Sequence, residues 1–338
     1  MHDAHYAVVV GINRYPALGD LRGPVGDAAL FAEWLRDPAG GALPPDNIRV
    51  VPASGTEVLH AYDAKPAVAE IVRALGDLNR TVEARVAADP TVWKRTRLYL
   101  FVAGHGMLPD GSDGALFAAN VSLDELGHCL DLRRYAQWYR RSGRFRELVL
   151  FADCCRNRID GAAAFGPPFT EPGEIENVVR IVVGYGAEFG REAFEGPVAD
   201  QPDQRRGYFT EALLSGLRRP RPDPTWGALR RYIADTVPQL AAAHGHDQRA
   251  ELNGDDDVVF GPGTSDDIAR RVTITFASGT PGPVDLLGGR LEVLGTWNPA
   301  DGPWVRQLRA GLYAVVSHGS ATQLAGITVA GADLDVHV

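Results

Sequence analysis

Cysteine is scarce in this sequence, and long apolar runs are missing from it. The 338 residues contain three cysteines, Cys129, Cys154 and Cys155, which do not form the pattern of a disulfide framework. We therefore expect a reducing, cytoplasmic compartment. No run of 18 or more apolar residues occurs, so we expect no membrane-spanning helix. The apolar stretch near the start is too short for a signal peptide and has no basic residues before it.

Basic charge is also in short supply. The chain has 34 Lys and Arg against 43 Asp and Glu, a formal net charge of −9. This balance argues against a surface that binds phosphate groups, so we expect no nucleic-acid partner. The apolar share of 45% and the charged share of 23% are ordinary for a soluble globular protein.

Short apolar runs alternate with amphipathic stretches over the first 263 residues. The apolar runs predict strands at 6–12, 47–51, 97–102, 147–152, 178–185 and 257–260. The amphipathic stretches predict helices at 25–36, 65–86, 130–141, 208–217 and 225–243. Strands that alternate with helices in this way predict an α/β domain, with a mostly parallel sheet and helices on both of its faces.

The composition changes near residues 261–267, and we place a domain boundary there, between residues 1–263 and 264–338. The second part consists of alternating or β-branched runs separated by Gly and Pro, which predicts a small all-β sandwich of about 70 residues. Its aromatic residues Trp297, Trp304 and Tyr313 are expected in the core. This part carries no chemical signature, and binding of a regulatory partner is compatible with it.

Two reactive side chains follow neighbouring strands of the predicted sheet. His105 comes after the strand at 97–102, and Cys155 comes after the strand at 147–152. Parallel sheets carry their sites at the carboxyl ends of the strands. A thiol needs a base to become a nucleophile, and imidazole is the usual base near neutral pH. Either residue alone is more often structural, but the pair, with glycines on both sides of the histidine, predicts a Cys–His site.

These motifs resemble the caspase and metacaspase family of cysteine peptidases. The sequence around the thiol is Asp153-Cys154-Cys155-Arg156-Asn157, and the histidine stands 50 residues upstream of Cys155, as in caspases. The Asp two residues before the thiol is closer to the metacaspase form. Cys at 154 and Asn at 157 depart from the family pattern. The resemblance covers residues 5–261, and in it residues 185–195 correspond to a loop that lines the substrate cleft.

The resemblance implies a cysteine endopeptidase that acts on a protein or peptide substrate. In it, Cys155 attacks the scissile carbonyl and His105 moves the proton. The backbone amides of Gly106 and Cys155 hold the oxyanion. A third member that orients the histidine stays unassigned.

The resemblance also implies cleavage after a basic residue, because Asp27 and Asp153 match the two acids of the metacaspase S1 pocket. Two carboxylates favour a cation, and Arg satisfies them bidentately. Two structural alternatives stay open: Asp27 as a charge at a helix N-terminus, and Asp153 as an orienting group for the Cys loop. Cleavage after Asp, as in caspases, would need a basic pocket, for which Arg14, Arg22 and Arg156 are candidates.

The other two cysteines allow weaker interpretations. Cys154 could form a strained, easily reduced disulfide with Cys155, but a passive thiol in the pocket wall is the simpler interpretation. Cys129 is expected as a buried residue of a helix.

No cofactor is expected, although calcium activation is possible because some metacaspases need calcium. The candidate ligands are Asp110, Asp113 and the acids at 255–257, which are otherwise exposed turn residues. Arg158 is a candidate self-cleavage site in a loop rich in Pro and Gly.

The resemblance implies a role in regulated proteolysis, in bacterial stress or antiviral defence, with a partner that gates the enzyme. The alternative from a different class is a non-catalytic interaction protein on a caspase fold.

Overall fold

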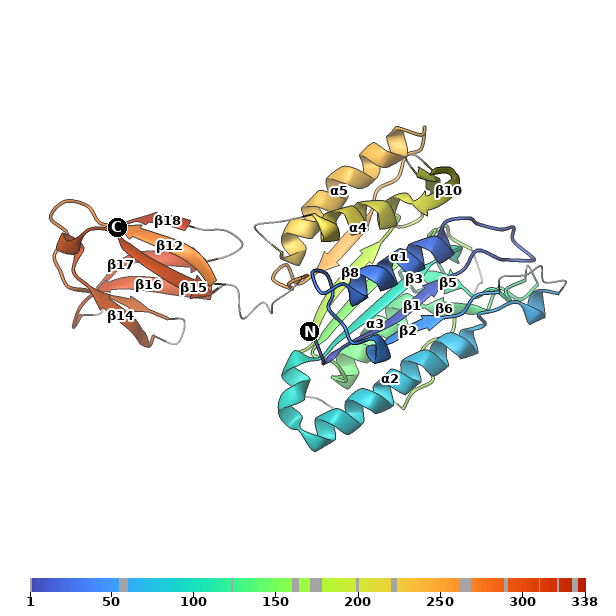
Figure 1. The fold of residues 1–338 in the computed structure, drawn as a ribbon, viewed down its shortest axis with the longest axis horizontal. Coiled ribbons are helices and arrows are strands. Elements are labelled where there is room, and N and C mark those ends of the chain that lie inside the picture. The colour runs from blue at the N-terminus through green and yellow to red at the C-terminus, as the bar shows by residue number, and fades with distance from the viewer. Residues whose placement is uncertain are drawn as a thin grey trace. The chain divides into compact units, whose positions relative to one another are not determined.

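The computed structural model describes residues 2–54, 60–122, 124–159, 164–170, 178–198, 201–219, 224–261, 269–288, 291–309, 311–320, 322–329 and 334–338. The chain divides into two compact units (Figure 1). The first contains Met1–Arg219 and Leu229–Asp255, and the second contains Pro220–Ala228 and Asp256–Val338. The boundary between residues 263 and 264 stays a prediction.

A six-stranded sheet in the order β11-β8-β7-β3-β1-β2 forms the centre of the first unit. Five of its strands run parallel, and the edge strand β11 is antiparallel to β8. The predicted mostly parallel sheet is thereby confirmed. The strands are β1 (His5–Gly11), β2 (Ile48–Val51), β3 (Arg97–Ala103), β7 (Glu147–Asp153), β8 (Arg180–Tyr185) and β11 (Glu251–Gly254).

Helices cover both faces of this sheet. They are α1 (Pro24–Arg36), α2 (Val68–Ala88), α3 (Leu132–Ser142), α4 (Tyr208–Arg218) and α5 (Trp226–Ala242), with short 3₁₀ turns η1 (Pro45–Asn47), η2 (Ala61–Asp63) and η3 (Pro90–Arg95). Tyr6 and Val8 of β1 belong to the core that α2 and α3 also line. On the opposite face, Phe31 of α1 stacks on Phe101 of β3, with ring centroids 4.6 Å apart. Strands β1, β3 and β7 are therefore buried on both faces, which explains their unbroken apolar sequences.

Local signals in the sequence set the ends of the helices. Pro24 stands in the first turn of α1, where its missing N–H costs no hydrogen bond. At the start of α3, Asp131 accepts a hydrogen bond from the backbone N–H of Arg134 at 3.0 Å. Gly143 ends α3 in the left-handed region, with φ of 56°.

Two small antiparallel sheets of the first unit have no counterpart among the predicted strands. One has the order β4-β5-β6, from β4 (Gly106–Met107), β5 (Ala115–Phe117) and β6 (Cys129–Asp131). The other pairs β9 (Glu195–Val198) with β10 (Gln201–Gly207). Four of these strands have two to four residues, which is too short to show a period of two in the sequence. The seven residues of β10, QPDQRRG, show no alternation of apolar and polar side chains.

Two expectations from the sequence are wrong. The last strand of the sheet is β11, and the predicted strand at 257–260 forms only an isolated bridge between Val259 and Thr225. Cys129 is buried as expected, but it lies in β6 and not in a helix. In both cases the apolar pattern marks burial correctly, but a stretch of three or four residues does not specify the type of element.

The second unit contains the predicted β domain. A three-stranded sheet, β15-β12-β18, and a four-stranded sheet, β14-β13-β16-β17, share one apolar core. Trp304 lies in this core, and Trp297 and Tyr313 pack against it. The strands are β12 (Ala269–Thr275), β13 (Val284–Leu287), β14 (Val293–Trp297), β15 (Trp304–Arg309), β16 (Gly311–Ser317), β17 (Gln323–Val329) and β18 (Leu334–His337), with a 3₁₀ turn η4 (Pro299–Asp301).

Within the described ranges, no helix combines the length and the apolar character that crossing a membrane requires.

Candidate active site

The register between β3 and β7 brings the two reactive side chains to the same edge of the sheet. Ala103 pairs with Asp153, and the N–H of Gly104 donates to the carbonyl oxygen of Asp153 at 3.2 Å. His105 and Cys155 each follow this pair by two residues. Parallel strands in this register therefore place the imidazole and the thiol beside each other, although they are 50 residues apart in sequence.

Gly106 lets the two strand ends approach closely. A Cβ atom at this position would lie 2.6 Å from the carbonyl oxygen of Cys155 and 2.8 Å from Cβ of Cys154. Both distances are shorter than real side chains tolerate, so only glycine fits. The oxyanion role of the Gly106 and Cys155 amides stays a prediction.

The imidazole of His105 is held from two sides. Its ring packs edge-on against Tyr15, with centroids 4.8 Å apart, and its backbone N–H donates to the Tyr15 hydroxyl at 3.1 Å. Nε2 lies 3.0 Å from the carbonyl oxygen of Gly19. A carbonyl only accepts, so Nε2 carries the proton and Nδ1 keeps the lone pair. Burial lowers the pKa of His105, which favours this neutral form.

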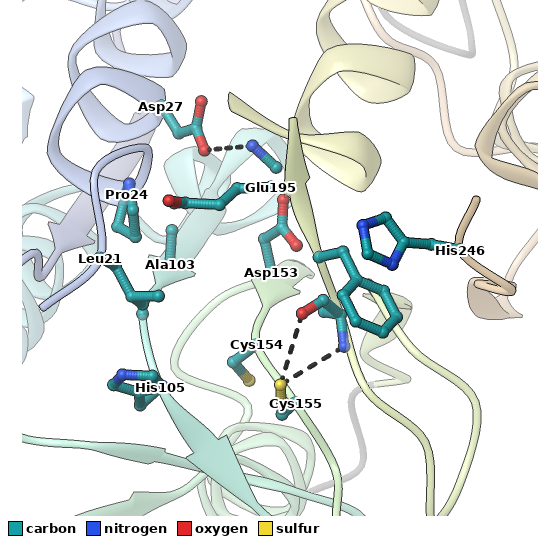
Figure 2. Close-up of a pocket in the computed structure, with 14 residues that line it drawn as sticks. Leu21, Pro24, Asp27, Ala103, His105, Asp153, Cys154, Cys155, Glu195 and His246 are labelled. Carbon is teal, nitrogen blue, oxygen red and sulfur yellow. Dashed lines mark hydrogen bonds between the residues drawn. The ribbon is translucent and has the colours of Figure 1, made fainter. Parts of the chain in front are cut away.

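The thiol of Cys155 contacts the backbone of Ala193. Its Sγ donates to the Ala193 carbonyl oxygen at 3.4 Å and accepts from the Ala193 N–H at 3.4 Å. Burial raises the pKa of Cys155, so the thiol is neutral at pH 7. His105 and Cys155 border the same cavity (Figure 2), but each is hydrogen-bonded to a backbone carbonyl and not to the other.

The cavity between these groups has a volume of about 300 Å³. It is lined by the ends of β3 and β7, by the first turn of α1 and the segment before it, by β9 and the residues before it, by the end of β10, and by the segment after α5. The lining residues are Leu21, Pro24, Asp27, Ala103, Gly104, His105, Asp153, Cys154, Cys155, Ala193, Phe194, Glu195, Gly207 and His246.

Both predicted S1 carboxylates border this cavity. Asp27 is only 2% exposed, and its Oδ2 accepts from the N–H of Gly207 at 3.0 Å. Its Oδ1 has no hydrogen-bond partner, and Nε of Arg206 lies 3.7 Å from it. Oδ2 of Asp153 accepts from the N–H of Thr210 at 2.9 Å and from its hydroxyl at 2.7 Å. These contacts fix both carboxylates in place and leave one oxygen of Asp27 for another group.

Burial makes both of these acids weak. Loss of solvent, together with the nearby charge of Asp153, raises the pKa of Asp27 to about 8. Loss of solvent also raises the pKa of Asp153 to about 6, against the hydrogen bonds from Thr210, which lower it. The unliganded cavity therefore holds Asp27 mainly in its protonated form at pH 7, and a cation would favour its ionised form.

Glu195 is a third carboxylate of the cavity, and the motifs in the sequence do not single it out. It opens β9, and its carboxylate accepts from the backbone N–H of Arg22 at 3.1 Å and of Gly23 at 2.8 Å. In Figure 2 its side chain extends toward Asp27. The only available signal is its position at the end of the 185–195 loop, which the family resemblance assigns to the cleft.

Comparison with known protein families identifies the domain. The family model described as "Caspase domain" matches residues 4–254, about three quarters of the chain. The chain belongs to the caspase domain family. The match covers the sheet, the Cys–His edge and all the residues that line the cavity.

Two similar proteins were found for this caspase domain. A protein described as a probable protease, from a Desulfuromonadales bacterium, is 29% identical over 225 residues. That match covers 63% of this chain but only 26% of the relative, so the chain spans about a quarter of the relative's length. The crystal structure of caspase-1 from Spodoptera frugiperda matches with a TM-score of 0.44 and 14% identity, over 75% of this chain and 86% of that one.

None of the three arginines considered for a basic pocket lines the cavity of this caspase domain. Arg14 forms an ion pair with Asp20 at an exposed position. Arg156 is fully buried, and its Nη1 donates to the carboxylate of Glu251 at 2.6 Å. Its guanidinium also lies over the ring of Tyr185, 4.2 Å from the centroid. Arg156 therefore anchors the segment that follows Cys155 to the edge of the sheet.

The remaining residues singled out in the sequence are Cys154, Arg158 and the candidate calcium ligands. Cys154 is 1% exposed, borders the cavity and is a free thiol, which fits the passive wall residue. Arg158 pairs with Asp110, and the backbone on both sides of it is bonded to Leu108. Among the residues that the structure describes, no three or more acids, histidines or cysteines gather to hold a metal ion. Calcium activation and self-cleavage stay predictions.

The neutral state of Cys155 can be tested by alkylation. Because the pKa of the thiol is raised, the rate of its reaction with iodoacetamide should increase by up to about tenfold per pH unit up to at least pH 9. Mass spectrometry of the Cys155 peptide measures the rate, and a Cys155→Ala protein gives the background from Cys129 and Cys154. A rate that is already constant between pH 5 and 7 would contradict the neutral thiol and indicate a thiolate–imidazolium pair.

Asp27→Asn should change how stability depends on pH. The folded protein retains the Asp27 proton up to about pH 8, whereas the unfolded chain loses it near 3.8. Stability therefore falls by up to about 1 kcal/mol per pH unit between pH 4 and 8 through this group. Asn removes this loss, so the gain of the variant over the natural protein in urea unfolding should grow from pH 5 to pH 8. An equal difference at both pH values would show that Asp27 is ionised in the folded state.

Proposed function

We propose that this caspase domain is a cysteine endopeptidase that cleaves peptide bonds after Arg or Lys. One observation carries the specificity: a carboxylate oxygen of Asp27, buried and without a hydrogen-bond partner, borders a cavity that also contains the candidate nucleophile. A buried polar atom without a partner is costly unless a ligand satisfies it. A guanidinium or ammonium group from the substrate supplies the hydrogen bond that this oxygen lacks and adds a positive charge to that of Arg206, whose Nε lies 3.7 Å away.

The arrangement of the acids supports a pocket for one long basic side chain. Asp27 and Glu195 lie on one side of the cavity, and Asp153 lies between them and the thiol of Cys155 (Figure 2). A side chain that reaches these carboxylates from an extended substrate places its own carbonyl carbon near the mouth of the cavity, where Cys155 lies. The planar guanidinium of Arg can bond two carboxylates at once, so Arg is favoured over Lys.

The chemistry follows from the protonation states. Nδ1 of His105 has the free lone pair because Nε2 is bonded to the Gly19 carbonyl. As Sγ of Cys155 forms a bond to the substrate carbonyl carbon, its proton passes to Nδ1. The same proton then moves to the departing amine when the C–N bond breaks, which leaves a thioester on Cys155. Water attacks the thioester, gives its proton to Nδ1, and releases the carboxylic acid and the free thiol.

Two hydrogen bonds of the Cys155 thiol must break before these reaction steps can begin. Sγ of Cys155 is bonded to Ala193, and no hydrogen bond joins it to His105. A substrate that lies along residues 193–195 would compete for the same backbone groups and leave Sγ free to turn toward Nδ1. Gly19 then serves as the third member of the site, because its carbonyl fixes the tautomer and the orientation of the imidazole.

The wider context also belongs to the proposal. Three cysteines that form no disulfide are compatible with a cytoplasmic location. A role in bacterial stress or defence, and a regulatory partner that binds the β domain, rest on the family resemblance alone.

Fluorogenic peptides that end in Arg or in Asp test the proposal directly. The natural protein should cleave the Arg peptide, and Cys155→Ala should abolish the activity. Asp27→Asn should lower kcat/KM for the Arg peptide by about 10²-fold, because it removes one of the buried carboxylates with which the guanidinium pairs. Parallel assays with calcium and with a chelator test metal activation. Cleavage of the Asp peptide alone would retain the Cys–His pair and overturn the basic specificity, whereas no cleavage of either would favour the non-catalytic scaffold.

Binding of a cation to Asp27 should depend on pH. In Cys155→Ala protein, which removes the thiol titration, we expect an Arg-ending peptide to bind more tightly as pH rises from 6 to 8 and then to level off. The reason is that Asp27 must lose its proton to pair with the cation, and its pKa in the empty cavity is about 8. Calorimetry measures the Kd, which should fall by up to about tenfold per pH unit. The same slope in the Cys155→Ala, Asp27→Asn double variant would show that another group is responsible.

A further inference from the structure

Arg206 is a cation that lies near the acidic side of the cavity without bordering it. It belongs to β10 and stands one residue before Gly207, whose N–H forms the hydrogen bond to Oδ2 of Asp27 that Figure 2 shows. Nε of Arg206 lies 3.7 Å from Oδ1, the other oxygen of the same carboxylate. Arg206 is not among the residues that line the cavity. Its guanidinium therefore acts on Asp27 without occupying the space in which a ligand would bind.

The distance between Arg206 and Asp27 permits an ion pair but not a hydrogen bond. At 3.7 Å, Nε and Oδ1 attract each other by charge, but they are too far apart for the proton to be shared. Oδ1 accordingly has no hydrogen-bond partner. Arg206 thus contributes a positive charge and leaves the lone pairs of Oδ1 for a donor that enters the cavity.

A second acid fixes the guanidinium in this place. Nη1 of Arg206 donates to Oε2 of Glu211 in α4, and Oε1 of Glu211 accepts from the hydroxyl of Ser215 at 3.3 Å. The side chain of Arg206 is only 18% exposed, so solvent and salt screen its charge weakly. Because Glu211 holds the Nη1 end, Arg206 cannot turn into the cavity without breaking this ion pair.

The charges that face Asp27 come from three strands and oppose one another. Asp153 at the end of β7 and Glu195 in β9 both disfavour a further negative charge, whereas Arg206 in β10 favours it. Loss of solvent raises the pKa of Asp27 most, the charge of Asp153 adds to this rise, and the charge of Arg206 lowers the pKa again. Without Arg206, Asp27 would retain its proton to a higher pH and would bind a cation less well near neutral pH.

We propose that Arg206 is a positioning residue for the acidic side of the cavity, where its charge favours the ionised form of Asp27 that a basic substrate side chain requires. This inference rests on the proposed peptidase function and adds to it a residue that sets the pH range of cleavage. Arg206 acts through Asp27 and not by contact with the substrate. Its removal therefore changes the pH at which the cavity binds a cation, and leaves the groups that bind it in place.

The test measures kcat/KM for the Arg-ending peptide from pH 6 to pH 9.5, in the natural protein and in Arg206→Gln. The ratio of the variant to the natural protein is compared across pH, because the titrations of His105 and Cys155 are common to both proteins and cancel. We expect a ratio of about 0.1 at pH 6.5, which corresponds to a rise of about one unit in the pKa of Asp27. The ratio should reach about one at pH 9.5, where Asp27 is ionised in both proteins.

Two further variants separate charge from structure. Arg206→Lys retains the positive charge, so its ratio should stay above about 0.5 at both pH values. Arg205→Gln is the matched control, because it removes the neighbouring cation of β10, which forms no ion pair with Asp27. Its ratio should vary by less than about twofold with pH. A ratio in Arg206→Gln that is lowered equally at every pH, or the same pH dependence in Arg205→Gln, would overturn the inference and leave the peptidase function intact.

Urea unfolding tests the same effect without a substrate. In the natural protein, the loss of stability through Asp27 ends near pH 8, because the folded protein gives up this proton there. In Arg206→Gln the loss should continue to about pH 9, and the Arg206→Gln, Asp27→Asn double variant should remove the difference. Equal pH dependence in the natural protein and in Arg206→Gln would contradict the inference. No cleavage of the peptide by any of these proteins would overturn the proposed function, and with it the role of Arg206 in cleavage, even where the unfolding curves differ.

Discussion

The pairing of Ala103 with Asp153 is the constraint on which the rest of the site depends. His105 and Cys155 each follow this pair by two residues, so the register between β3 and β7 determines how far the imidazole and the thiol lie from the end of the sheet. Asp153 has a second function here, since its side chain forms part of the acidic wall. A slip of one residue would turn that carboxylate to the opposite face of the sheet and separate the thiol from its base. Burial of both strands on both faces makes such a slip costly.

The protonation state of Asp27 in the unliganded cavity would change when a basic ligand binds. Asp27 is buried with a raised pKa, and among the described residues the cation that lies near it is Arg206. The thiol and the imidazole are neutral and bonded to backbone groups. The unliganded protein is therefore stable without a reactive thiolate, and a basic side chain in the cavity would supply the charge that the acids lack.

The larger elements could be predicted from the sequence because their patterns are long. Buried strands such as β1, β3 and β7 read as unbroken apolar runs, and the ends of parallel strands are where sites occur. The motif around the thiol indicated the family, and through it the two acids, Asp27 and Asp153, that border the cavity. Glu195 could not be found in the same way, because it lies in a short strand whose pairing with β10 has no signature in the sequence. The stacking of His246 on Phe194 joins residues 52 positions apart, and no periodicity reports such a contact.

Gly207 makes it difficult to replace the negative charge of Asp153 in the cavity wall by a positive one. A Cβ atom there would lie 2.0 Å from Oδ2 of Asp153, and one at Gly186 would lie 2.7 Å from its Oδ1. The carboxylate of Asp153 thus occupies the space that Gly186 and Gly207 leave by having no side chains. This space fits a short, flat group. An arginine in place of Asp153 has no room to lie there, so reversing the charge of this wall requires new backbone around Gly186 and Gly207 and not one exchanged side chain. For protein engineering, the shape of this part of the cavity is a property of the main chain.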